Sequence, residues 1–262
     1  MRRRASTPQV NTRLDQALVA RGICESREKA KRAVMAGLVR VNGQVARKAS
    51  DSVREADLLS LDAVEKFVSR GGYKLEHALQ HFSLAVAGLT AVDLGASTGG
   101  FTDCLLQHGA ACVFAVDVGQ GQLAWKLRND SRVVVLEKTN AREIKSSQLS
   151  AVSGQPVLEL QLVVVDCSFI SLRKILPAAV GLLNSASGRI VALVKPQFEA
   201  GKAEADKGEG VITDPAVHAR VLAELEAFVQ AELPAIAWRG VTESPLLGPA
   251  GNKEFLVLLE RV

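Results

Sequence analysis

Five apolar runs that alternate with helical patterns constrain the fold of this chain more than any other feature. The runs predict strands, and helical patterns such as FTDCLLQHG and SLRKILPAAVGLL lie between them. This alternation predicts a parallel, doubly wound α/β sheet that binds its ligands at the carboxyl ends of the strands. The predicted strands are TAVDL (90–94), CVFAVDV (112–118), RVVVLE (132–137), LQLVVVD (160–166) and RIVALVK (189–195).

Charged residues mark the carboxyl ends of these predicted strands. Asp93, Asp166 and Lys195 stand at three ends, and Asp117 stands one residue inside a fourth. These residues are therefore candidates for function. The last segment, from AIAWRGVTES to EFLVLLERV, predicts an antiparallel hairpin at the edge of the sheet.

The first predicted strand runs into a glycine-rich turn, VDLGASTGGFTD (92–103). No lysine follows its glycines as a phosphate-binding loop requires, and Ser97 replaces the second glycine of a dinucleotide fingerprint. Asp93 suits the ammonium group of S-adenosylmethionine, and Asp117 suits its ribose hydroxyls. The loop favours S-adenosylmethionine over a dinucleotide, and a turn without a ligand is the third alternative. The candidate cofactor residues are Asp93, Gly95, Ser97, Thr98, Gly99, Phe101, Asp117 and, after the third strand, Asn140.

The segment after the fourth strand restricts the methyl acceptor. Amino-group methylation commonly uses an Asn/Asp-Pro-Pro-aromatic run there, whereas this chain has DCSF. Cytosine C5 methylation needs a reactive thiolate, and Asp166 would raise the pKa of Cys167. A ribose 2′-hydroxyl needs a general base, for which a lysine with a lowered pKa is suitable. Lys195 is well placed for that role, although a single lysine at a strand end is as easily a solvent-exposed charge.

The first 60 residues are more basic than the rest of the chain. They hold 13 Lys/Arg against 6 Asp/Glu, a net charge of +7, and the remaining 202 residues carry −3. The segment predicts a helix in NTRLDQALVARG capped by Asn11 or Thr12, a second helix capped by Ser26, and a hairpin turn at Asn42-Gly43. A small basic module of this kind suggests docking to a polyanion, and the alternative is a solvated charged face.

The motifs RLDQALVARG and SREKAKRAVMAGLVRVNG resemble the alpha-L RNA-binding module of a small-subunit ribosomal protein and of pseudouridine synthases. The resemblance covers roughly residues 11–60. It implies that the second helix and the adjoining turn face RNA and hold phosphates, which gives docking rather than base recognition. The residues so placed would be Arg27, Lys31, Arg32, Arg40, Arg47 and Lys48.

Four further segments, SRGGYKLEHAL, VVVDCSFISL, ALVKPQFE and SPLLGPAGNKEF, resemble in order the motifs of the TlyA/hemolysin A family of FtsJ-like rRNA 2′-O-methyltransferases. The resemblance implies S-adenosylmethionine-dependent methylation of a cytidine ribose in ribosomal RNA, free or in a ribosomal subunit. It also implies an RNA-binding domain at 1–62, a linker at 63–70 and a methyltransferase domain at 71–262. The family's catalytic tetrad falls on Lys74, Asp166, Lys195 and Glu254.

The tetrad residues are expected to divide the work. Lys195 would be the base and Lys74 would hold the acceptor oxygen, while Asp166 orients Lys195 and Glu254 positions Lys74 or the ribose. Two other functions are open: a non-catalytic rRNA-binding assembly factor, and a membrane-active hemolysin. The sequence offers no signal peptide or membrane span for the second, so we expect a cytoplasmic protein that binds no membrane.

Other features carry weaker expectations. His77 and His81 share a helix face without a third ligand, so we expect a surface or capping role and no metal. Residues 199–214 predict a solvated loop, with an RNA-ordered lid using Lys202 and Lys207 as the alternative. Phe101, Phe169 and Phe198 either stack on a base or pack in the core. The four cysteines, Cys24, Cys104, Cys112 and Cys167, are expected to be reduced and mostly buried.

Overall fold

The computed structural model describes residues 11–62, 65–154, 159–184 and 186–262. The chain forms two compact units, which divide between Lys66 and Phe67. This division lies within the predicted linker 63–70. Residues 63 and 64 of that linker and the basic stretch 1–10 lie outside the described residues. Each unit is described by itself below.

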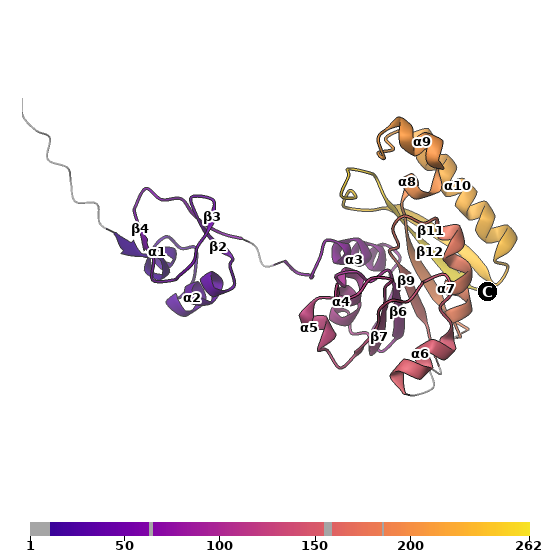
Figure 1. Cartoon of the computed structure of the whole chain (residues 1–262), viewed down its shortest axis with the longest axis horizontal. Helices are drawn as coiled ribbons and strands as arrows, with labels where there is room; N and C mark the ends of the chain where they lie inside the picture. The colour runs from indigo at the N-terminus through magenta and orange to yellow at the C-terminus, as the bar shows by residue number, and fades with distance from the viewer. Residues whose placement is uncertain (1–10, 63–64, 155–158, 185) are drawn as a thin grey trace, which may run out of the picture. The chain divides into compact units, whose positions relative to one another are not determined.

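The N-terminal unit packs two helices against short strands (Figure 1). Its core gathers Leu14, Leu18, Val34 and Val39, all buried. Strand β1 pairs with β4, and β2 lies between β3 and β5, all antiparallel. The elements are β1 (Thr12–Arg13), α1 (Leu14–Ala20), α2 (Arg27–Met35), β2 (Val39–Val41), β3 (Gln44–Val45), β4 (Ser52–Val53) and β5 (Leu59–Leu61).

Local sequence signals place most of these elements. The hydroxyl of Ser26 accepts a hydrogen bond from the Lys29 amide and caps α2, as predicted. Asn42 and Gly43 both have positive φ, at 52° and 82°, which confirms the predicted tight hairpin between β2 and β3. The predicted cap of the first helix is wrong. Arg13 holds the N-cap position of α1 without a side-chain cap, because Thr12 and Arg13 pair with β4 instead.

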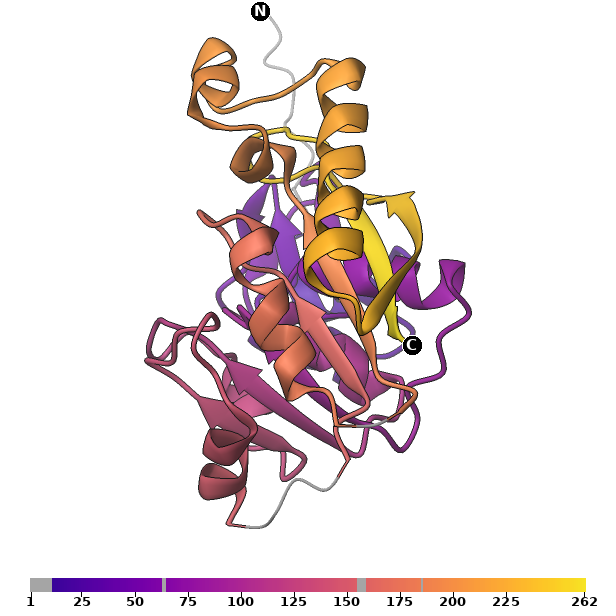
Figure 2. The same cartoon turned by 90° about the vertical axis from the view of Figure 1, so that its right-hand side faces the viewer.

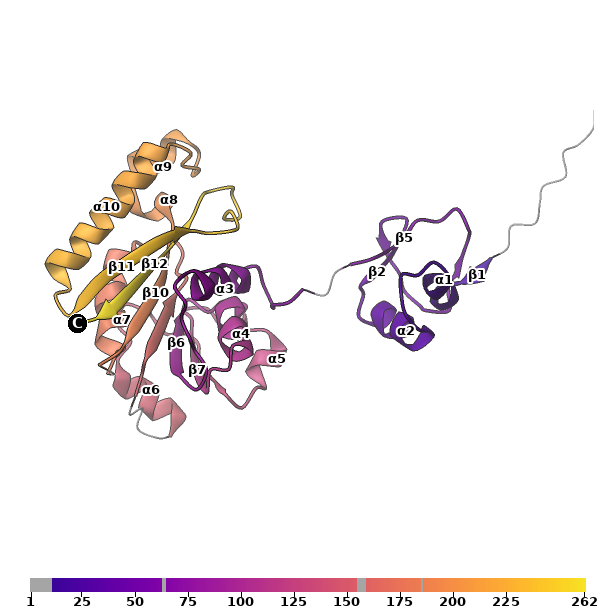
Figure 3. The same ribbon diagram turned by 180° about the vertical axis from the view of Figure 1, so that it is seen from behind.

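The second unit is built on a seven-stranded sheet with the order β11-β12-β10-β9-β6-β7-β8 (Figures 1 and 3). The five predicted strands are parallel, and the predicted C-terminal hairpin supplies the two antiparallel strands at one edge. The strands are β6 (Thr90–Leu94), β7 (Cys112–Val116), β8 (Val133–Leu136), β9 (Leu162–Val165), β10 (Arg189–Val194), β11 (Ile236–Glu243) and β12 (Phe255–Arg261).

Helices cover both faces of this sheet. Figures 1 and 3 show α3, α4 and α5 on one face and α6, α7 and α10 on the other, and Figure 2 shows the long α10 lying along the C-terminal strands. The helices are α3 (Gly71–His81), α4 (Gly100–Gln107), α5 (Trp125–Arg128), α6 (Ser146–Ser153), α7 (Leu176–Leu182), α8 (Pro196–Glu199), α9 (Lys202–Lys207) and α10 (Pro215–Glu232), with a 3₁₀ turn η1 (Leu172–Lys174).

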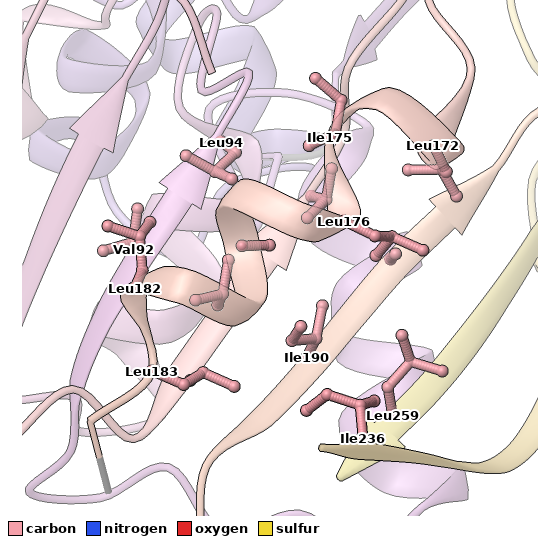
Figure 4. Packing of buried hydrophobic residues seen from close by; sticks show 14 of the residues in the cluster. Val92, Leu94, Leu172, Ile175, Leu176, Leu182, Leu183, Ile190, Ile236 and Leu259 are labelled. Carbon is pink, nitrogen blue, oxygen red and sulfur yellow. The ribbon is translucent and has the colours of Figure 1, made fainter. Parts of the chain in front are cut away.

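Alternate residues of the central strands enter two separate cores. Val163 and Val165 of β9 pack with α7 and α10, whereas Leu162 and Val164 pack with α3 and α4. Figure 4 shows the first core, where α7 lies against Val92 and Ile190. A sheet covered on both faces needs strands that are apolar throughout, which explains the unbroken apolar runs of the sequence.

The architecture brings the predicted functional residues to one edge of the sheet. Asp93 lies at the penultimate position of β6, and Asp117, Asp166 and Lys195 directly follow β7, β9 and β10. Glu254 directly precedes β12, whose direction is opposite to that of β10, so it reaches the same edge. The candidate site therefore lies at the edge of the sheet where the parallel strands end and β12 begins.

Candidate active site

Two adjoining cavities open at the carboxyl ends of the parallel strands. The larger is a cleft of about 1290 Å³ that runs past the ends of β6, β7 and β8. The smaller, of about 440 Å³, holds all four predicted tetrad residues. Gly95, Ser97, Asp166 and Ser168 line both cavities, so the two spaces meet at these residues.

The glycine-rich loop shapes the junction between the cavities. Gly95 has φ of 87°, and a Cβ atom added there would lie 2.7 Å from the backbone oxygen of Asp166. Only glycine permits this close approach of the loop to the end of β9. The loop continues through Ser97, whose φ is also positive at 48°.

Backbone amides hold the Asp117 carboxylate at the rim of the larger cleft. Oδ2 accepts a hydrogen bond of 2.8 Å from the Ser97 amide, and Oδ1 accepts one of 2.7 Å from the Gly119 amide. The carboxylate therefore has a fixed orientation and retains acceptor capacity for a ribose hydroxyl. Asn140 lines the same cleft after β8.

Asp93 is fully buried and borders the smaller cavity. Its Oδ2 accepts hydrogen bonds from the amide and the hydroxyl of Thr102, at 2.9 and 2.7 Å. No described residue donates to Oδ1. Burial raises the pKa of Asp93 to about 7, against the lowering effect of the Thr102 hydroxyl. A buried carboxylate with an unused oxygen fits a cationic ligand group.

The remaining cofactor candidates divide between cavity and core. Thr98 lines the smaller cavity. Gly99 lines neither cavity, and an added Cβ atom there would strike Leu127 of the core. Phe101 borders the smaller cavity but is only 2% exposed and packs within α4 in the core.

Two lysine–carboxylate pairs form the centre of the smaller cavity. Lys195 Nζ lies 2.6 Å from Asp166 Oδ1, and Lys74 Nζ lies 2.5 Å from Glu254 Oε2. Both lysines and Glu254 are buried. The structure thus brings together four residues that span 180 positions of the sequence, each lysine beside its own acid.

Ser168 is a site residue that the sequence reasoning missed. Its hydroxyl accepts a hydrogen bond of 2.8 Å from Lys195 Nζ. The signal for it is the DCSF segment, in which Ser168 stands two residues after Asp166. Cys167, between them, has a pKa raised to about 12, first by burial and then by Asp166. This disfavours a reactive thiolate, as expected.

A buried asparagine holds the loop that carries Glu254. Asn252 Oδ1 accepts a hydrogen bond from the Ile212 amide, and Nδ2 donates to the Gly210 oxygen, both at 2.8 Å. Its own carbonyl accepts from the Gly248 amide at 2.8 Å. The segment before α10 and the loop before β12 are thereby joined.

The candidate RNA-binding residues of the N-terminal unit fall into two groups. Arg27 lies 3.1 Å from buried Asp15, Lys31 2.8 Å from Glu28, and Arg40 2.8 Å from Asp62. Hydrogen bonding by Arg13, the largest cause, lowers the pKa of Asp15 to about 2. The other group is exposed and forms no ion pair with any residue that the structure describes. It consists of Arg32, Arg47 and Lys48.

Two of the weaker expectations concern His77 and the segment 199–214. His77 Nε2 lies 2.9 Å from the Thr242 hydroxyl, and the described ranges contain no group of three metal-ligating side chains. Residues 199–214 include the helix α9, so the predicted loop is wrong over Lys202–Lys207; an ion pair between Glu204 and Arg220 ties this helix to α10.

The aromatic residues of the larger cleft differ from Phe101. Phe169 is 91% exposed and has φ of 63°, and its ring centroid lies 5.2 Å from that of Phe198. Both line the larger cleft.

Over the residues that the structure covers, no helix is long and apolar enough to cross a membrane.

Comparisons with known proteins identify the family of the chain. A model of the FtsJ-like methyltransferases matches residues 67–261, and one of the S4 domain matches residues 12–59. The 16S/23S rRNA (cytidine-2′-O)-methyltransferase TlyA of Mycobacterium tuberculosis (strain ATCC 25618 / H37Rv) is 48% identical over 94% of this chain and 89% of its own. Hemolysin A of Brachyspira hyodysenteriae is 39% identical over 93% and 98%, respectively.

A solved structure extends the match to both units of the chain. It is that of a Streptococcus thermophilus protein named as a hemolysin, with a TM-score of 0.70 and 42% identity. The match covers 96% of this chain and 89% of that one.

Proposed function

The chain belongs to the FtsJ-like methyltransferases, in their TlyA/hemolysin A family, and we propose that it transfers a methyl group from S-adenosylmethionine to the 2′-hydroxyl of a cytidine ribose in ribosomal RNA. The observation that carries the proposal is the pair of buried lysines, each beside a carboxylate, in a cavity that adjoins the cofactor cleft.

The residues at the cavity junction fit the methyl donor. Asp93 offers an unused buried oxygen to an ammonium group, and Asp117 offers a fixed carboxylate to ribose hydroxyls. Asn140 lines the cleft where an adenine would extend from that ribose. When bound, S-adenosylmethionine supplies an electrophilic methyl group on a cationic sulfur. The chain's task is to align the acceptor and to remove its proton.

In our proposal, Lys195 removes that proton. Nζ of Lys195 accepts it from the 2′-hydroxyl after transferring one of its own protons to solvent, and Asp166 keeps Nζ in place. Lys74 donates a hydrogen bond to the acceptor oxygen and stabilises the negative charge that develops there. Glu254 fixes the position of Lys74.

RNA binding by the N-terminal unit supplies the acceptor. Arg32, Arg47 and Lys48 are proposed to contact phosphates, because they are exposed and form no ion pair with a described carboxylate. Arg27, Lys31 and Arg40 contribute to a smaller extent, because each already pairs with an acid. Since the substrate is ribosomal RNA, free or in a subunit, we expect the protein to act in the cytoplasm.

The experiment that tests this function incubates the purified protein with methyl-labelled S-adenosylmethionine and with small or large ribosomal subunits from a bacterium that lacks the modification. Mass spectrometry of nuclease digests locates the label. Label on a cytidine ribose supports the proposal. Binding of S-adenosylmethionine without label on any RNA would instead favour a non-catalytic assembly factor.

A lysine variant tests the assignment of the base. Lys195→Ala should reduce turnover by about 10²–10⁴-fold, the range for loss of a general base. Its affinity for S-adenosylmethionine and for RNA should stay near that of the unaltered protein. Substantial residual turnover would show that another group accepts the proton.

A further inference from the structure

Lys195 Nζ has two protein acceptors in the smaller cavity. Asp166 Oδ1 lies 2.6 Å from Nζ, and the Ser168 hydroxyl oxygen lies 2.8 Å from it. Nζ is tetrahedral, with one position bonded to Cε. Two acceptors fix the directions of two N–H bonds, and they leave one remaining direction for the lone pair of the neutral amine.

We propose that Ser168 is a positioning residue for the methyl transfer: with Asp166, it aims the lone pair of Lys195 at the ribose 2′-hydroxyl. The inference rests on the proposed function, because it assigns Lys195 as the base. It adds a hydroxyl to the four residues that the family resemblance implied.

The location of Ser168 suits this role. Ser168 lines both the cofactor cleft and the cavity of the lysines, together with Asp166. The 2′-hydroxyl must reach this junction, because the methyl donor lies on one side of it and the base on the other. Ser168 therefore orients the Lys195 amine at the place where the bond between the ribose oxygen and the methyl carbon forms.

The backbone on both sides of Ser168 is held. Before it, the Asp166 amide donates to the Leu94 oxygen at 2.9 Å. After it, Glu199 accepts hydrogen bonds of 2.6 Å from the Ser171 hydroxyl and from the Leu172 amide. The loop between β9 and η1 is therefore anchored on both sides of Ser168, whose own exposed side chain bonds to Lys195 Nζ.

The size of the effect follows from the geometry of the amine. Without Ser168, the hydrogen bond to Asp166 still holds one N–H, but the lone pair can take either of two directions. This halves the productive population, and the loss of one hydrogen bond to Lys195 adds a further factor, so we expect kcat to fall about 5- to 20-fold.

The test compares Ser168→Ala with Ser168→Thr and with Ser131→Ala as a control. Ser131 is exposed and lies away from both cavities. For each protein, we would measure kcat and KM with ribosomal subunits, the affinity for S-adenosylmethionine by calorimetry, and the melting temperature. The expected result is a lower kcat for Ser168→Ala alone, with KM, cofactor affinity and melting temperature unchanged, and recovery in Ser168→Thr.

Other outcomes would overturn the inference. If Ser168→Ala keeps a kcat within twofold of the unaltered protein, Ser168 does not aim Lys195. If KM, cofactor affinity and melting temperature change together and threonine does not restore kcat, its role is structural. If the unaltered protein labels no RNA, the proposed function fails, and this inference fails with it.

Discussion

At the scale of single residues, the charged form of Asp93 lowers the stability of the free protein and is proposed to bind the ammonium group of S-adenosylmethionine. Its carboxyl group is fully buried, and its pKa is raised from 3.8 to about 7. A carboxyl group of this kind stabilises the fold below the unfolded pKa, and that contribution is lost as the pH rises through the folded pKa. The free protein therefore becomes less stable between pH 4 and 7 on account of this group.

We predict that Asp93→Asn removes this pH dependence. The asparagine oxygen can still accept both hydrogen bonds from Thr102, but the side chain carries no charge. The melting temperature of the variant, relative to the unaltered protein, should rise from pH 4 to 7 and then level off. Its affinity for S-adenosylmethionine at pH 8 should fall about 10- to 100-fold. A melting difference that is independent of pH would contradict the assignment.

The sequence could predict some of these residues but not all. Asp117, Asp166 and Lys195 were visible because a parallel sheet brings its strand ends to one edge. The pairing of Lys74 with Glu254 came from the family resemblance alone, because helix and strand patterns contain no information about contacts 180 positions apart. The burial of Gly99 and the contact of Ser168 with Lys195 depend on tertiary packing, which local patterns do not encode.

At the scale of elements, the glycine-rich turn after β6 lies so close to the end of β9 that only glycine fits at position 95. We predict that Gly95→Ala destabilises the fold by about 2–4 kcal/mol, because the new methyl group meets a backbone oxygen and the positive φ is costly. Gly88→Ala is the matched control, since Gly88 also has a positive φ but an added Cβ atom there has nothing within 4 Å. It should cost only about 1 kcal/mol. Equal losses in chemical denaturation would mean that the close approach contributes nothing.

The loop before β12 depends on Asn252 in a similar way. Asn252→Ala leaves the buried Ile212 amide without its acceptor, so we predict a loss of about 2–4 kcal/mol in the free energy of unfolding. Because the same loop carries Glu254, kcat should fall as well. Lys253→Ala, at an exposed neighbour paired with Glu243, should change stability by less than about 0.5 kcal/mol. A stable, fully active Asn252→Ala protein would exclude this role for Asn252.

At the scale of the whole molecule, a basic unit for docking is joined to a larger unit that carries the chemistry. We predict that changing Arg32, Arg47 and Lys48 together to alanine weakens rRNA binding and lowers the slope of log affinity against log salt by about 2–3, or 0.7–0.9 per phosphate contact. The affinity for S-adenosylmethionine should be unchanged. An unaltered salt dependence would mean that other residues meet the phosphates.

Arg27→Ala should affect the stability of the N-terminal unit more than its binding to RNA. Arg27→Ala removes one of two arginines around the buried carboxylate of Asp15, so we predict a loss of about 1–3 kcal/mol in stability of the N-terminal unit. Its effect on the salt slope should be smaller than that of each unpaired residue. Melting curves monitored across both units would detect the loss.

The position of Glu254 has a consequence for the growing polypeptide. Lys74 is synthesised 180 residues before the acid that it pairs with, and β12 begins directly after that acid. A nascent chain that ends before Glu254 lacks one of the residues that line the smaller cavity. If Glu254 positions Lys74 as proposed, we expect such an incomplete chain to transfer no methyl group until β12 pairs between β10 and β11.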